Sequence, residues 1–191
     1  LVPLKYRSRL ISMVKTWGRK KAFDDFTKQY FSLTRRYNTS EELKANPPHA
    51  DIYIAGSDQI WNTESYNGKE PGYYLDFGTA KKISYAASFA VSEIQEEWRP
   101  FVKSQLSHFQ HISVRENTGV SILKSMGFQN GVQVVDPVFL LGAEEWKTLA
   151  HKAKDYGLKE NNYIVVYDFL NDERIASFAK KLKEYTNMTV V

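Results

Sequence analysis

Short apolar runs rich in Val, Ile and Tyr alternate with longer segments of helical periodicity along most of this 191-residue chain. Runs of this kind are typical of buried strands, because the strands of a parallel sheet have both faces covered. The runs that we interpret as strands are 51–55, 82–87, 111–115, 132–136 and 163–167. Strands that alternate with helices form βαβ units. The chain is therefore predicted to be an α/β protein with a mostly parallel, doubly wound sheet and helices on both faces.

Two helices are predicted between these runs. Residues 92–109 repeat apolar side chains along one helical face, and Ser92 is followed three residues later by Gln95, the spacing of a capping box. Residues 117–126 have helical periodicity and stop at Gly127, a residue type that commonly ends helices.

The order of the segments predicts one domain and the start of another. We place an N-terminal domain at residues 1–150, with a basic helical segment at 1–45. The polar stretch 151–162 is interpreted as a linker. Residues 163–191 contain a strand, a helix and a beginning strand, which are too few elements to close a core. We interpret them as the start of a second, similar domain.

Basic residues are concentrated at the beginning of the chain. Residues 1–50 hold 11 Lys and Arg against four Asp and Glu, although the whole chain has a net charge of only +4. One interpretation of residues 4–21 is a basic amphipathic helix that touches an anionic membrane surface or a phosphorylated lipid carrier. The other is a solvated helix face that covers the core, which the lack of a second basic run favours. No zinc-finger, RNP or helix-turn-helix pattern accompanies the basic region, so nucleic acid is not an expected partner.

Several chemistries lack support in the sequence. The chain contains no Cys, which excludes disulfides and thiolate chemistry and is compatible with a reducing cytosol. No apolar run reaches transmembrane length, so we expect a soluble, cytoplasmic protein. His-Glu-x-x-His, Walker and Gly-x-Gly-x-x-Gly motifs are missing. We predict neither a metal nor a cofactor.

A polar corner follows the first predicted strand, and sites in α/β sheets lie outside the carboxyl ends of strands. The residues of this corner are Gly56, Ser57, Asp58, Gln59, Trp61 and Asn62. The amides of Gly56 and Ser57 suit a phosphate or carboxylate at a strand-to-helix turn, but Asp58 places a negative charge in the same turn. A sugar held by the polar side chains and stacked on Trp61 fits better. The alternative is local, with Ser57 as a helix N-cap and Trp61 as a core anchor.

Further candidates lie at the ends of later strands. Arg115, beside Glu116, is the best cation for an anionic ligand, because a guanidinium binds carboxylates and phosphates in a bidentate manner. The alternative is a structural ion pair of Arg115 with Glu116 or Asp136. Asp136 precedes Pro137, which turns it toward the same edge of the sheet, as a base or as a turn former. Ser88 ends a run of small residues that a ligand or a packed helix could approach.

Five sequence blocks carry a resemblance to a known family. They are GSDQIWN (56–62), YYLDF (73–77), KISYAASF (82–89), SVRE (113–116) and VVDPVFLL (134–141). In this order they resemble the polysaccharide pyruvyl transferase family.

The resemblance implies two Rossmann-like domains that face a cleft, as in the B-type glycosyltransferases. It implies transfer of a pyruvyl group from phosphoenolpyruvate, as a ketal, to a sugar of a bacterial cell-surface polysaccharide or of a lipid-linked precursor, in the cytoplasm near the inner membrane face. Exopolysaccharide and cell-envelope biosynthesis would be its role. For this reaction Arg115, Asp58 and Asp136 are our catalytic candidates, and the other corner residues, with Ser88 and Glu116, would bind substrate.

Two motifs of the family are missing from the chain: its opening Asn-Tyr-Gly region and the Ser-Phe-His of its second domain, whose histidine is the family's acid candidate. We therefore interpret the chain as a fragment that is inactive by itself. Two alternatives stay open: a non-catalytic scaffold that binds sugars or anions, and a B-type glycosyltransferase that uses a nucleotide sugar.

Overall fold

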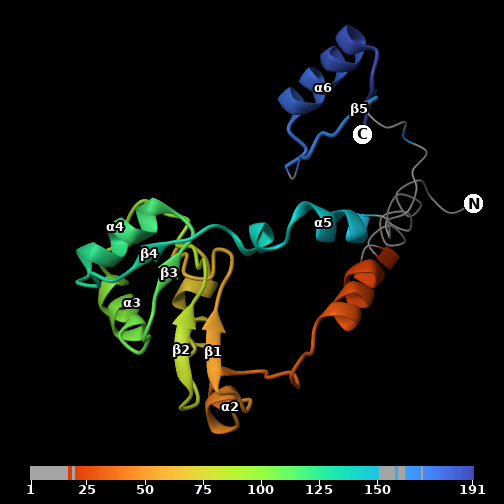
Figure 1. The fold of residues 1–191 in the computed structure, drawn as a ribbon. Coiled ribbons are helices and arrows are strands. Elements are labelled where there is room, and N and C mark those ends of the chain that lie inside the picture. The colour runs from red at the N-terminus through yellow and green to blue at the C-terminus, as the bar shows by residue number, and fades with distance from the viewer. Residues whose placement is uncertain (1–16, 19, 151–157, 159–161, 169) are drawn as a thin grey trace, which may run out of the picture. The chain divides into compact units, whose positions relative to one another are not determined.

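A computed structural model describes the chain except for residues 1–16, 19, 151–157, 159–161 and 169 (Figure 1). The chain forms two compact units, Leu1–Pro137 and Val138–Val191. The predicted basic helix at 4–21 and the predicted linker at 151–162 lie largely outside the described residues. The exact domain limits remain predictions, and each unit is considered by itself below.

The first unit contains two small parallel sheets. Strand β1 (Ile52–Ala55) pairs with β2 (Lys81–Ser84), and β3 (Ser113–Val114) pairs with β4 (Val132–Gln133). Isolated parallel bridges, Ile83↔His111 and Ala87↔Val114, connect the two sheets. The predicted α/β class is therefore confirmed as a mixed fold with parallel pairing. A single doubly wound sheet with helices on both faces remains a prediction.

Strand β1 shows which face of its sheet carries the core. Tyr53 and Ala55 are buried, whereas Ile52 and Ile54 are exposed. Successive side chains of a strand point to opposite faces, so the described core packs on one face of this strand. The expectation that this run is buried on both faces is wrong for β1 within the described residues.

Short helices connect the strands. Helix α2 (Ser40–Ala45) precedes β1, and the 3₁₀ turns η1 (Asn67–Lys69) and η2 (Pro71–Tyr74) lie between β1 and β2. Helices α3 (Arg99–Leu106) and α4 (Asn117–Ser125) precede and follow β3, and Figure 1 shows both beside β3 and β4.

Helix α3 begins later than the sequence pattern predicts. The capping box at Ser92 and Gln95 does not start a helix, because α3 begins at Arg99 with Pro100 in its first turn. Proline lacks an N–H donor and is tolerated only in the first turn, so it sets this start. Helix α4 agrees with the prediction, with Met126 as its C-cap and Gly127 at a φ of 96° directly after it.

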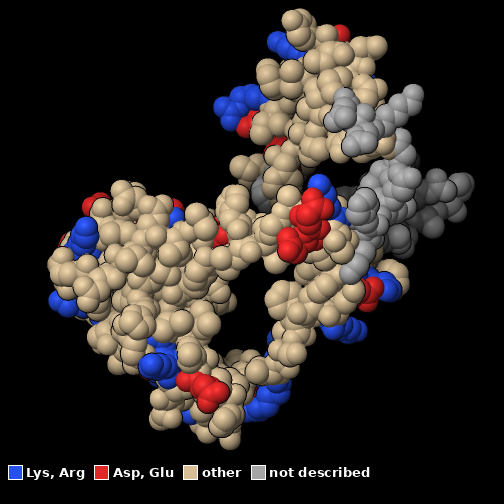
Figure 2. All heavy atoms as spheres, viewed as in Figure 1, with Lys and Arg blue, Asp and Glu red and all other residues tan. Residues whose placement is uncertain are grey.

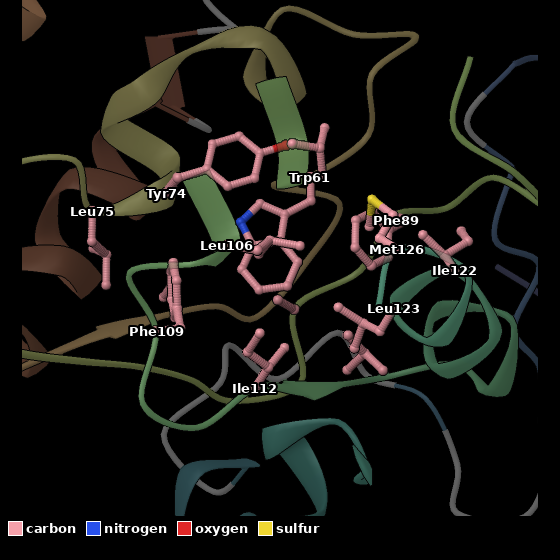
Figure 3. Close-up of a cluster of buried hydrophobic side chains, with 14 of the residues drawn as sticks. Trp61, Tyr74, Leu75, Phe89, Leu106, Phe109, Ile112, Ile122, Leu123 and Met126 are labelled. Atoms are coloured by element: carbon pink, nitrogen blue, oxygen red, sulfur yellow. The ribbon is translucent and has the colours of Figure 1, made fainter. Parts of the chain in front are cut away.

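Aromatic rings dominate the core of the first unit (Figure 3). The Trp61 ring is fully buried and stacks on Tyr74 with centroids 5.7 Å apart and an interplanar angle of 3°. It also contacts Phe89 and Phe109 at centroid distances of 5.4 Å and 5.6 Å. These rings join the segment after β1 to the segments around α3. The corner that follows β1 is thereby anchored at its far end.

The second unit has a strand pair and a long helix. It contains η3 (Pro137–Leu140, which starts at the last residue of the first unit), α5 (Ala143–Ala150), β5 (Tyr163–Ile164), α6 (Glu173–Thr186) and β6 (Thr189–Val190). Strands β5 and β6 are parallel. Helix α6 begins where the Asp172 side chain accepts a hydrogen bond from the Arg174 amide, and it ends at Asn187 in a left-handed conformation. Among the described residues, no helix is long and apolar enough to cross a membrane.

Candidate functional site

Four chain segments meet beyond the carboxyl ends of β1 to β4. Residues 56–58 follow β1, residues 85–88 follow β2, Arg115 follows β3, and Asp136 lies just after β4. Backbone hydrogen bonds join them, since the Arg115 amide donates to the Ala87 carbonyl at 3.1 Å and the Ser88 amide donates to the Asp58 carbonyl at 2.9 Å. Ligand sites of α/β folds occupy this edge.

Arg115 is the centre of the charged side chains at this edge. Its Nη1 lies 2.9 Å from Asp136 Oδ2, its Nε lies 3.0 Å from Glu116 Oε1, and its Nη2 lies 3.8 Å from Asp58 Oδ1. We call Ser57, Asp58, Arg115, Glu116 and Asp136 the rim cluster. The structure thus brings together all three catalytic candidates of the sequence analysis, Arg115, Asp58 and Asp136.

The electrostatics of the rim cluster are dominated by carboxylates. The hydrogen bond to Glu116, and then the one to Asp136, raises the pKa of the Arg115 guanidinium above its ordinary value. Three carboxylates surround one guanidinium, which leaves an excess of negative charge. Arg115 is therefore already compensated, and an added anion would compete with Glu116 and Asp136 for its nitrogens.

The Ser57 hydroxyl connects the rim cluster to the backbone. Its Oγ lies 3.3 Å from Asp136 Oδ2 and 3.2 Å from the Ala86 carbonyl oxygen. A hydroxyl has one proton to donate, so it donates to one of these acceptors at a time. Ser57 does not cap a helix, because residues 58–66 directly after it are not helical. Both the N-cap alternative and the predicted strand-to-helix turn are wrong.

Gly56 allows the close approach that forms the corner. It has a φ of 123°, and a Cβ at this position would lie 2.1 Å from the Tyr85 carbonyl oxygen. The Gly56–Ser57 peptide is cis, and Asp58 has a φ of 85°. The Asp58 side chain is 81% exposed despite its approach to Arg115. The corner therefore presents a carboxylate to solvent at the edge of the sheet.

Two predicted substrate contacts lie in the interior instead. Trp61 is fully buried, and its Nε1 donates to the Tyr73 carbonyl at 3.2 Å. Its ring faces cannot stack on a sugar, because core aromatics cover them. Ser88 is also fully buried, and its Oγ accepts a hydrogen bond from the Ala90 amide. The structure therefore assigns both residues to packing, which corrects the expected sugar contact at Trp61.

Gln59 and Asn62 differ in their surroundings. Gln59 is exposed beside Asp58, whereas Asn62 is half-buried and its Oδ1 accepts from the Glu64 amide at 2.9 Å. The sequence analysis missed Gln133, whose Nε2 donates to the Arg115 carbonyl at 3.1 Å. The only signal for it is a polar residue within an apolar run. Gln133 supports the backbone that carries Arg115.

The chemistry of the rim cluster is that of hydrogen-bond acceptance. Carboxylate oxygens accept hydrogen bonds from hydroxyl groups. Among the described residues, no group of three or more His, Cys, Asp or Glu is arranged to hold a metal ion.

The protein has a mixed α/β fold, and its carboxylate-rich rim cluster lies beyond the carboxyl ends of parallel strands. Ligand sites of α/β folds are found at this edge. A family model described as "Polysaccharide pyruvyl transferase" matches residues 3–188, nearly the whole chain. The chain therefore belongs to this transferase family, as the resemblance indicated. Comparisons with curated proteins and with solved structures gave no match.

Proposed function

We propose that the protein transfers a pyruvyl group from phosphoenolpyruvate to two hydroxyls of a saccharide. The rim cluster is part of the site in this proposal, and the first unit is one half of a Rossmann-like, two-domain enzyme. Family membership supports polysaccharide as the acceptor class. The observation that carries the proposal is the exposed Asp58 carboxylate beside the Arg115–Asp136 pair at the carboxyl edge of the strands.

The reaction needs acid and base at defined atoms. One sugar hydroxyl adds to C2 of phosphoenolpyruvate while a proton is delivered to the methylene carbon, which becomes a methyl group. A second hydroxyl then displaces the phosphate and closes the ketal, and its proton leaves with the phosphate. Each hydroxyl requires an acceptor for its proton in the transition state.

The charge of the rim cluster favours the acceptor over the donor. Phosphoenolpyruvate carries a carboxylate and a phosphate, whereas the cluster has a negative excess. We propose Asp58 as the proton acceptor for a sugar hydroxyl, with the exposed Gln59 as a further contact. Arg115 then positions Asp136 and Glu116, which revises the expectation that it binds the donor. Cations for the donor would come from residues outside the cluster.

The test compares Asp58→Asn with Asp51→Asn, an exposed aspartate that precedes β1 at its opposite end. Phosphate release from phosphoenolpyruvate is measured with the full-length gene product and a saccharide acceptor. We expect Asp58→Asn to lower turnover roughly 10²- to 10⁴-fold, the range for loss of a general base, while Asp51→Asn retains wild-type turnover.

Calorimetric titration of phosphoenolpyruvate accompanies the turnover assay. Wild-type turnover by Asp58→Asn removes this residue from the chemistry. An absence of phosphoenolpyruvate binding refutes the donor assignment. Nucleotide binding would then favour glycosyl transfer from a nucleotide sugar, and binding of neither would favour the non-catalytic scaffold.

We further propose peripheral contact with the cytoplasmic membrane surface, where a lipid-linked acceptor would be found. Residues 20–30 are helical, and Phe23, Phe26 and Tyr30 are all exposed. Neither interpretation of residues 4–21 is tested, because most of that segment lies outside the described residues. Exposed aromatics beside basic residues are typical of interfacial helices. On the visible face in Figure 2, Lys and Arg are scattered among acidic and neutral side chains.

Co-sedimentation with phosphatidylglycerol vesicles checks this contact. We expect the doubly substituted Phe23→Ser, Phe26→Ser protein to lose binding, whereas Phe178→Ser, at an exposed position on α6, keeps it. Equal binding by the wild type, the Phe23→Ser, Phe26→Ser protein and Phe178→Ser would contradict the membrane contact.

A further inference from the structure

A groove separate from the rim cluster lies between two segments of the first unit. Residues 37–44, which include α2, form one wall, and residues 66–73, from η1 to η2, form the other. Its volume of about 640 Å³ is within the range of small-molecule sites. In Figure 1, α2 lies beside the start of β1, whereas the rim cluster follows the end of that strand. The groove is therefore remote from the proposed chemistry.

Tyrosine rings line the groove. Tyr37, Tyr66 and Tyr73 all contribute to it, and Tyr66 and Tyr73 are 73% and 40% exposed. The Arg35 guanidinium lies 4.4 Å from the centroid of the Tyr37 ring and holds it from one side. Tyrosine presents a large apolar face together with a polar tip at low entropic cost. Such rings offer flat platforms for a ligand with apolar C–H faces.

An ionised carboxylate lies among these rings. Glu70 accepts hydrogen bonds from the Ser40 hydroxyl and from the Tyr66 hydroxyl, the latter at 2.8 Å. These two bonds lower the pKa of Glu70 below its ordinary value. A carboxylate has about four acceptor positions, so Glu70 retains capacity for hydroxyl donors of a ligand. Because both walls contribute to this network, it holds the groove in shape.

The charge of the groove disfavours an anionic ligand. Glu41 and Glu70 line it together with one cation, Lys44. The Lys44 ammonium forms an ion pair with Asp76 at 2.7 Å. A phosphate would therefore meet a negative environment, whereas a neutral ligand rich in hydroxyls would find acceptors. Pyranose rings combine hydroxyl donors with apolar C–H faces that stack on aromatic rings.

We propose that this tyrosine groove binds a neutral segment of the acceptor polysaccharide, remote from the sugar that is modified. This inference rests on the proposed function, because it takes the polysaccharide as substrate. A second contact on one polymer raises the effective concentration of the acceptor at the site. The groove would thus favour long acceptors over short ones.

Direct binding tests the groove without turnover. Cellohexaose, chitohexaose and a β-linked galactohexaose are titrated into the full-length gene product by calorimetry. We expect at least one hexasaccharide to bind, and the Tyr66→Ala, Tyr73→Ala double substitution to weaken its binding about 10-fold or more. Tyr66→Phe retains the ring and should lose less. Tyr185→Ala, at an exposed position on α6, is the matched control and should bind as the wild type does.

The outcomes separate this inference from the proposed function. If none of the three hexasaccharides binds, or if the double substitution binds equally well while unfolding as the wild type does, the groove inference is overturned. Binding of a proline-rich peptide in place of the sugars also overturns it. Phosphate release from phosphoenolpyruvate with a disaccharide acceptor is measured on the wild type alone. If phosphate is released but no hexasaccharide binds, the proposed function stands and the groove inference fails. If no phosphate is released, the proposed function is refuted, and the hexasaccharide titrations still decide whether the groove binds sugars.

Discussion

The ion pair between Arg115 and Asp136 offers the sharpest test of how the rim cluster is held together. The perturbation is a double-mutant cycle of Arg115→Met, Asp136→Asn and the combined variant. The Nη1–Oδ2 distance is 2.9 Å, and the two side chains are 27% and 31% exposed. This burial places the pair between exposed ion pairs, worth up to about 1 kcal/mol, and buried pairs, whose disruption costs about 3–5 kcal/mol.

The magnitude follows from this intermediate position. A hydrogen bond to a charged group contributes about 1.5–3 kcal/mol. We expect Arg115→Met to lower the free energy of unfolding by about 2–3 kcal/mol, because it leaves Asp136 and Glu116 without their cation. Asp136→Asn should cost about 1–2 kcal/mol, since Glu116 still compensates the guanidinium. The double variant should cost less than the sum, with a coupling energy of about 1–1.5 kcal/mol.

Urea unfolding of the four proteins at pH 7, followed by circular dichroism at 222 nm, measures these energies. Repetition in 1 M NaCl should reduce the coupling only partly, because partly buried pairs are screened less than exposed ones. If the stability changes of the two single variants add up to that of the double variant within about 0.3 kcal/mol, the predicted coupling between Arg115 and Asp136 is refuted. They would show that the pair does not hold the cluster in solution.

Three further predictions concern the core, the corner and the groove. Trp61→Ala should lower the free energy of unfolding by about 3–5 kcal/mol, whereas Trp17→Ala, at a 69% exposed position, should change it by less than about 0.5 kcal/mol. Equal effects of the two substitutions in urea unfolding would contradict the stacked core. Gly56→Ala should lower the free energy of unfolding by about 3 kcal/mol or more, because the new methyl group meets a backbone oxygen at a residue with positive φ. The control Gly18→Ala, whose methyl group meets nothing within 4 Å in a helical segment, should raise the melting temperature slightly, and equal melting temperatures of the two variants would contradict the prediction. Because its pKa is lowered, ionised Glu70 stabilises the fold at pH values above the ordinary carboxyl pKa, and this stability is lost as the pH falls through the pKa of the folded state. Glu70→Gln should therefore flatten the decline of the urea midpoint between about pH 5 and 3, and a decline equal to that of the wild type would exclude the contribution.

Local signals were sufficient for most of the elements. Every predicted strand overlaps an observed one, because runs of β-branched and aromatic residues favour extended backbone wherever a partner strand exists. The observed strands are shorter, since a ladder extends only as far as the neighbouring strand pairs with it. The end of α4 at Gly127 follows from local backbone preference. The start of α3 was missed because Pro100 overrides the capping signal at Ser92.

The rim cluster could be predicted in part. Its residues follow strands, and the carboxyl ends of parallel strands share one edge of a sheet, so their proximity was foreseeable. Which carboxylate pairs with which nitrogen of Arg115 could not be foreseen, because this pairing depends on the register between β3 and β4. Sequence alone also left Trp61 equally suited to a sugar platform and to the core. Its burial is decided by Tyr74, Phe89 and Phe109, which lie far from it in the chain.

The amino-acid sequence by itself determined the α/β class, the family and which segments contain strands, because these depend on local composition and on the order of motifs. Tertiary structure alone decided the charge balance around Arg115, the burial of Trp61 and Ser88, and the groove in which Ser40 meets Glu70. These features arise from contacts between residues that are distant in the chain. Their geometry is set by strand register and packing, which no local pattern encodes.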